Sequence, residues 1–154
     1  MTSEQQTPPL PPPSDPRLLT VLVSVGYVAA VIAAWGLISL ILDIDVISEK
    51  NAGPLLGPLM VLCATIVVFL SLWTLRNWRS VAGPALGATA SVYLVMLVIG
   101  AVGYAYTQRD ITWLVLFTAR YALSPFVIAA ALLGGLSVVF LWAVTFRSRR
   151  DKRA

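Results

Sequence analysis

The sequence contains no histidine and only one cysteine, Cys63. A single cysteine cannot close a disulfide within the chain, and zinc sites in proteins are built mainly from cysteine and histidine. Histidine is also the side chain that most often transfers protons near neutral pH. Without a nucleophile–base pair or a metal-ligand pattern, the sequence predicts no catalytic residue, no metal site and no cofactor. We therefore expect a protein that is not an enzyme.

Charge is scarce as well. Only 12% of the 154 residues are charged and 58% are hydrophobic, and the mean hydropathy is +0.85. Soluble domains carry about 25% charged residues, so a water-soluble fold of this length would expose far too much apolar surface. The composition indicates a protein whose solvent is lipid.

Four apolar runs are long enough to cross a bilayer. They cover about 18–42, 55–75, 85–106 and 125–146, and at ~1.5 Å per residue each reaches the ~30 Å of the hydrocarbon layer. The sequence therefore predicts an all-α fold, a polytopic transmembrane four-helix bundle over residues 17–147. Six prolines in residues 1–16 predict a disordered amino-terminal tail, and residues 148–154 form a basic tail.

The run 111–123 leaves two interpretations open. It is apolar apart from Thr112, Thr118 and Arg120, and Ser124-Pro125 after it is a typical helix cap and first helical residue. In the first interpretation, 111–123 is a short helix at the outer membrane interface and Ser124-Pro125 starts the fourth span. In the second, one long helix kinks near Pro125 and projects beyond the membrane.

The basic residues predict the orientation, because those beside membrane spans favour the cytoplasm. Lys50, Arg109 and Arg120 fall on one side of the predicted threading. The other eight of the eleven fall on the opposite side: Arg17, Arg76, Arg79, Arg147, Arg149, Arg150, Lys152 and Arg153. We expect a multi-pass protein of the plasma membrane with both termini in the cytoplasm and the acidic loop 43–54 outside.

The aromatic residues fit the same two levels, since amphipathic rings gather at membrane interfaces. The inner group is Trp73, Trp78, Trp142 and Phe146, and the outer group is Trp35, Tyr104, Tyr106, Trp113 and Tyr121.

Small residues at a spacing of four predict where helices pack, because in lipid the attraction between helices comes from close backbone contact. The predicted packing residues are Gly26, Ala30 and Ala34 in the first span, Gly83, Gly87 and Ser91 in the third, and Ala130 and Gly134 in the fourth. We expect these stripes chiefly to pack one monomer; the alternative is that one of them forms an oligomer interface.

Ionisable residues inside a membrane usually mark function, yet none lies at the centre of a predicted span. Arg120 is the closest case, because it interrupts an apolar stretch on the outer side. It is predicted to be an interface anchor whose head group reaches water, or else an ion-pair partner or an anchor for an anionic ligand. Its candidate partners, Asp43, Asp45, Glu49 and Asp110, are predicted on the same side.

The carboxyl-terminal tail predicts lipid contact. Five basic residues lie within seven positions: Arg147, Arg149, Arg150, Lys152 and Arg153. Each contributes about 1 kcal/mol of binding free energy to an anionic leaflet. The expected partners are thus membrane lipids, with an anionic leaflet on the cytoplasmic side, and either a second copy or another membrane protein. A nucleic acid is not expected, because the segment is too short to form a folded basic face.

The chain resembles the small uncharacterised four-helix membrane proteins of high-GC Gram-positive (actinobacterial) type, through its four spans, proline-rich leader, basic tail and excess of arginine over lysine. It lacks the acidic residue of the first span on which small multidrug transporters depend. The sequence predicts a non-enzymatic accessory or interaction subunit of unknown specific function; the alternative is a small channel or transporter that acts as a homo-oligomer.

Overall fold

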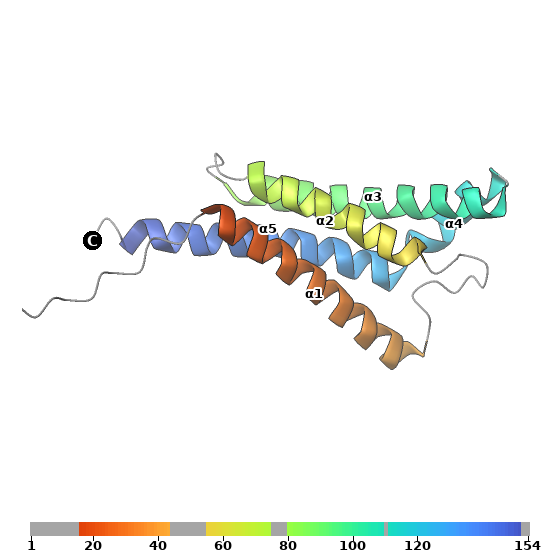
Figure 1. The fold of residues 1–154 in the computed structure, drawn as a ribbon, viewed down its shortest axis with the longest axis horizontal. Helices are drawn as coiled ribbons and strands as arrows, with labels where there is room; N and C mark the ends of the chain where they lie inside the picture. Colours follow the sequence, from red (N-terminus) through yellow and green to blue (C-terminus); the bar gives the residue numbers. More distant parts are fainter. Residues whose placement is uncertain (1–15, 44–54, 75–79, 110, 152–154) are drawn as a thin grey trace, which may run out of the picture.

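The computed structural model describes residues 16–43, 55–74, 80–109 and 111–151 (Figure 1). Within these ranges the chain forms helices only. They are α1 (Pro16–Leu42), α2 (Leu56–Thr74), α3 (Ala82–Gln108), α4 (Thr112–Tyr121) and α5 (Pro125–Asp151). The predicted tail 1–16, apart from Pro16, and most of the loop 43–54 lie outside the described residues.

Proline and a left-handed residue set several helix ends. Pro16 and Pro125 are the first residues of α1 and α5, where a missing N–H costs no helical hydrogen bond. Pro84 lies in the first turn of α3, which begins earlier than the predicted start at residue 85. Arg109 ends α3 with a φ of 54°, and its N–H donates to the Tyr106 carbonyl. The chain reverses there and α4 follows.

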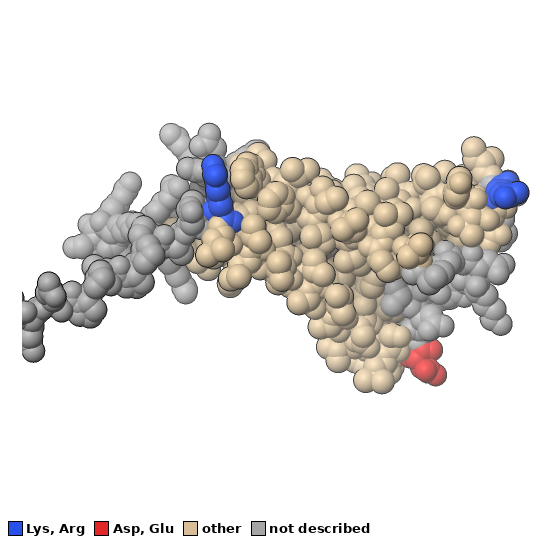
Figure 2. Space-filling model, in the orientation of Figure 1, with Lys and Arg blue, Asp and Glu red and all other residues tan. Residues whose placement is uncertain are grey.

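Four of the described helices are long and apolar enough to span a membrane: Arg17–Leu42, Leu56–Thr74, Ala82–Gln108 and Pro125–Thr145. Large apolar side chains lie on the outside of the bundle, such as Leu40, Leu86 and Val115. On the face drawn in Figure 2, the coloured charged side chains lie at the two ends, with an uncharged surface between them. The fold is thus the expected all-α bundle with four candidate spans.

The α3–α5 pair forms the middle of the bundle. α2 packs on α3, α1 packs mainly on α5, and α4 packs against α3 (Figure 1). Val68, Val92 and Val138 come from three different helices and have no accessible surface. The centre of the bundle is therefore filled by side chains from α2, α3 and α5.

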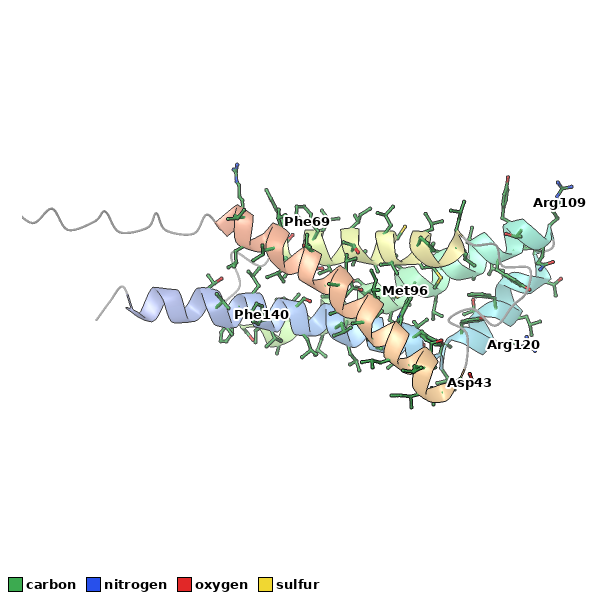
Figure 3. All side chains as sticks on the ribbon, turned by 60° about the horizontal axis from the view of Figure 1, so that its bottom comes forward. Asp43, Phe69, Met96, Arg109, Arg120 and Phe140 are labelled. Atoms are coloured by element: carbon green, nitrogen blue, oxygen red, sulfur yellow. The ribbon has the colours of Figure 1, made fainter. Side chains whose placement is uncertain are left out.

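The carboxyl-terminal part of α1 diverges from the other helices (Figures 1 and 3). Val23, Tyr27, Val31 and Trp35 form its buried stripe, and no residue beyond Trp35 in α1 is buried. Leu40 is 80% exposed. The last two turns of α1 therefore present apolar side chains to the surroundings on most sides.

Hydroxyl groups within the helices mostly bond to their own backbone. Ser24 donates to the Thr20 carbonyl and Thr65 to the Val61 carbonyl, each one turn earlier. The same bond is made by Ser71, Thr74, Thr89, Thr107, Thr118, Ser137 and Thr145. Such bonds satisfy a hydroxyl inside an apolar environment without a partner helix, so these residues have a structural explanation.

Candidate functional site

The backbone is interrupted between α4 and α5. α4 ends at Tyr121 and α5 begins at Pro125. Across the break, the Ser124 N–H donates to the Tyr121 carbonyl at 3.0 Å, which is a tighter turn than an α-helix makes. Of the two interpretations of 111–123, this geometry matches a separate short helix, although α4 lies packed on α3. Its depth in a membrane stays a prediction.

Three aromatic side chains donate hydrogen bonds to carbonyl groups around this junction. The Tyr93 hydroxyl of α3 donates to the Ala122 carbonyl at 2.7 Å. The Trp35 indole N–H of α1 donates to the Phe126 carbonyl at 3.0 Å, and the Tyr27 hydroxyl donates to the Ala130 carbonyl at 3.3 Å. α1 and α3 are therefore bonded to opposite sides of the break.

A stack of three aromatic rings begins on α3 and continues along α4, and one ring pair in it joins the two helices. Phe117 stacks on Tyr104 with ring centroids 5.3 Å apart, and Tyr121 stacks on Phe117 at 4.1 Å. Phe117 lies directly over Gly100, where a Cβ would come within 2.7 Å of its ring. The absence of a side chain at Gly100 thus makes the room that the Phe117 ring occupies.

A small cavity adjoins the junction. It holds about 10 Å³ and is lined by apolar surface from Trp35, Gly57, Met60, Tyr121, Ser124 and the first turn of α5. This is about the space of one water molecule, and a water needs polar partners that the walls do not offer. The cavity that these residues enclose is too small for a metabolite.

The predicted small-residue stripes divide into inward and outward groups. Ala130 and Gly134 lie buried in α5, and a Cβ at Gly134 would lie 3.1 Å from Val92. Gly26 and Gly87 have nothing within 4 Å of the same position. Ala30 and Ala34 are half-buried, whereas Gly83 and Ser91 are exposed. Of Gly26, Gly87 and Gly134, only Gly134 therefore has neighbouring side chains within 4 Å of a Cβ.

The predicted charged residues are placed as follows. Arg120 is exposed near the end of α4, and Asp43 is exposed after α1 with a φ of 51°. Both lie at the same end of the molecule as Arg109 (Figure 3). Asp45, Glu49 and Asp110 are outside the described residues. The predicted ion pairs of Arg120 stay predictions.

At the opposite end, Arg17 lies over the ring of Trp73, 6.0 Å from its centroid, a cation–π distance. α5 continues as a helix through Asp151, so the helix extends beyond the predicted end of the fourth span at 146. Arg147, Arg149 and Arg150 lie in its last turns, and their side chains are outside the described part of the structure. Lys152 and Arg153 lie outside the described residues.

Trp35 and Tyr104 belong to the aromatic group predicted at the outer membrane level, and their depth in a membrane stays a prediction. The structure buries both rings, to 9% and 3% exposure, inside the bundle. The carbonyl partners of Tyr93 and Trp35 were not predicted. Ser124-Pro125 was the available signal for the Tyr93 bond, because a new helix that starts at a proline leaves the last carbonyls of the preceding helix without helical donors. Nearby spans must then be searched for a tyrosine or tryptophan donor.

A search of curated proteins and a search of solved structures each found no match for this chain. One family model matches residues 16–154, which covers all the described helices. The chain therefore belongs to DUF6121, a family of unknown function.

Proposed function

We propose that this protein is a non-enzymatic accessory subunit that binds another membrane protein through its lipid-facing surface. The observation that carries this proposal is the filled interior. Val68, Val92 and Val138 close the centre, and the described mid-span hydroxyls of Ser24 and Thr65 bond within their own helices. A bundle built in this way offers its outer faces, rather than its interior, for function.

The outer face of α3 supports a protein partner. Gly83, Gly87 and Ser91 lie there at a spacing of four, all exposed, and Gly87 has open space beside it. Small residues let a second helix approach closely, and a hydroxyl can bond across such a contact. This face supports close docking of a helix from a partner protein.

The test is purification from native membranes in mild detergent, with Gly87→Leu compared with Gly36→Leu. Both glycines are exposed in helices and have nothing within 4 Å of a Cβ, so both variants should keep the wild-type thermal stability. We expect a membrane protein that co-purifies in a fixed ratio with the wild type and with Gly36→Leu, and is lost with Gly87→Leu. Equal retention in both variants contradicts the assigned face, and purification of a lone monomer contradicts the subunit function.

The second candidate is a small channel or transporter that acts as a homo-oligomer, and the same exposed α3 face favours it. Native mass spectrometry distinguishes the two functions, because this candidate requires an oligomer of one chain that Gly87→Leu dissociates. Solute movement into liposomes that contain the oligomer would support it. Absence of such an oligomer would contradict the channel or transporter and leave the accessory subunit as the proposed function.

We further propose that the protein lies in the plasma membrane with both termini in the cytoplasm. The charge distribution supports this, since the end that holds Arg17 also holds the last turns of α5 with Arg147, Arg149 and Arg150. Those residues, with Lys152 and Arg153, are proposed to bind anionic lipid. Tags at residues 1 and 154 should be unreachable from outside intact cells, and a tag at residue 48 should be reachable; any other pattern contradicts the orientation.

A further inference from the structure

Two hydrogen-bond donors lie together at the end of the bundle where α1 begins and α2 ends (Figure 1). Arg17 belongs to the first turn of α1, and its guanidinium carbon lies 6.0 Å from the ring centroid of Trp73 on α2. Phe69 packs beside Trp73 with ring centroids 5.7 Å apart. A cation and an indole N–H are thus brought to one place by two different helices.

Neither donor is used within the described part of the chain. There, Arg17 has no carboxylate partner and the indole N–H of Trp73 has no acceptor, whereas Trp35 donates its indole N–H to the Phe126 carbonyl. A cation–π contact leaves the N–H donors of a guanidinium available. Arg17 is exposed and Trp73 is 52% exposed, so both donors can reach an acceptor outside the protein.

An exposed apolar stripe on α2, formed by Leu62, Ile66 and Leu70, leads from this donor pair toward the middle of the bundle. These residues precede Trp73 at helical spacings, and each is more than half exposed. Residues 62–73 cover about 16 Å along the helix, which is close to half of the ~30 Å hydrocarbon layer. The α2 stripe therefore matches the length of an acyl chain in one leaflet.

We propose that this end of the bundle binds one anionic phospholipid, with its phosphate at Arg17 and Trp73 and an acyl chain along the α2 stripe. The guanidinium and the indole N–H donate to phosphate oxygens, and charge-assisted hydrogen bonds of this kind are stronger than neutral ones. The last turns of α5, which carry basic residues, lie at the same end. Their positive potential favours a lipid of net negative charge over a zwitterionic one.

This site rests on the lipid contact proposed above for the same end of the molecule, and it adds a separate binding position on α1 and α2. It needs neither a protein partner nor a particular orientation. Micelles have no inside or outside, so a titration in micelles tests the site, whereas the tags at residues 1, 48 and 154 test the orientation separately.

The test is solution NMR of the full chain, labelled with nitrogen-15 at tryptophan, in dodecyl maltoside micelles. Phosphatidylglycerol is added, and the indole N–H signal of Trp73 is followed after its assignment through Trp73→Phe. We expect this proton to shift downfield and to saturate at a single lipid per protein, with phosphatidylcholine binding more weakly. The indole signal of Trp35 should stay in place, because its N–H is already bonded to Phe126.

Arg17→Gln removes the charge at an exposed position. It should weaken the binding of phosphatidylglycerol about fivefold, which corresponds to about 1 kcal/mol for one arginine beside an anionic lipid. The other indole signals should not move, which shows that the fold is kept. Arg109→Gln is the matched control, because Arg109 is an exposed arginine at the opposite end of the molecule (Figure 3), and it should leave the titration unchanged.

An absent or unsaturable shift of the Trp73 signal overturns the proposal, and so does equal lipid affinity of the wild type and Arg17→Gln. Equal affinity for phosphatidylcholine overturns the preference for an anionic lipid. Glycerol phosphate has the phosphate but no acyl chain. If it gives the same shift at the same concentration, the ligand is a free phosphate and the lipid site is wrong.

Discussion

A close contact of α3 and α5 at Gly135 predicts that one added methyl group would strongly lower the stability of the protein. A Cβ built on Gly135 would overlap Thr89 Oγ1 and lie 3.2 Å from the carbonyl oxygen of Ala85. The Thr89 hydroxyl can turn away only by breaking its 3.0 Å bond to the Ala85 carbonyl, while its Cβ, at 3.5 Å, stays in ordinary contact. The backbone oxygen moves only if the two helices separate.

The magnitude follows from overpacking. Forcing one extra methyl group into a filled contact costs about 1–3 kcal/mol, and here the lost Thr89 bond adds to it. We therefore expect Gly135→Ala to lower the free energy of unfolding by about 2–3 kcal/mol. Gly134→Ala meets only methyl groups of Val92 and Val68, at 3.1 and 3.4 Å, so its loss should be smaller, at about 1 kcal/mol.

Gly87→Ala is the matched control, since it makes the same substitution on an open face. Alanine forms helix better than glycine by about 1 kcal/mol in water-exposed helices, so this variant should be as stable as the wild type or more so. The assay is reversible unfolding in mixed detergent micelles, followed by far-ultraviolet circular dichroism. Equal stability of Gly135→Ala and Gly87→Ala would refute the packing argument.

Three further perturbations have clear expected outcomes. Trp35→Phe removes the indole donor to the Phe126 carbonyl and should cost about 1 kcal/mol in the same unfolding assay; the half-exposed Trp73, changed to Phe, should cost less, and the reverse order would contradict the assigned bond. Arg109→Gly relieves a left-handed φ of 54° and should stabilise the protein by about 0.5–1 kcal/mol. Gln108→Gly, at the last residue of α3, removes the side-chain bond to the Tyr104 hydroxyl and should destabilise it. Arg120→Ala should lower the folded yield in detergent if the side chain forms an ion pair; an unchanged yield and thermal stability would exclude that pair.

The spans were predictable because hydrophobic length alone defines them. The ends of α3 were less so. The helix runs from Ala82 to Gln108, beyond the predicted 85–106, because Gly83-Pro84 lies in its first turn rather than before it. Its last residue is set by the left-handed Arg109, and no glycine or proline marks that position in the sequence.

The direction in which each small-residue stripe faces could not be predicted. In a soluble bundle, polar residues mark the outside of a helix, but in lipid both faces of a helix are apolar. The stripe that contains Gly26 therefore has the same pattern as the stripe that contains Gly134, although only Gly134 meets neighbouring side chains. Likewise, Tyr93 was recognisable as a mid-span polar residue, but its partner at Ala122 depends on a backbone break that only the folded chain positions.

The unequal helix lengths have a consequence for the surrounding bilayer. α2 has 19 residues and spans about 28 Å, whereas α1 and α3 have 27 and span about 40 Å. A 40 Å helix fits a hydrocarbon layer of about 30 Å only when it tilts or leaves that layer at one end. The diverging end of α1 meets this need by inclination, so lipid beside α1 and lipid beside α2 should differ in local thickness. Such a thickness gradient around one small protein would bias which neighbours settle on each side of it.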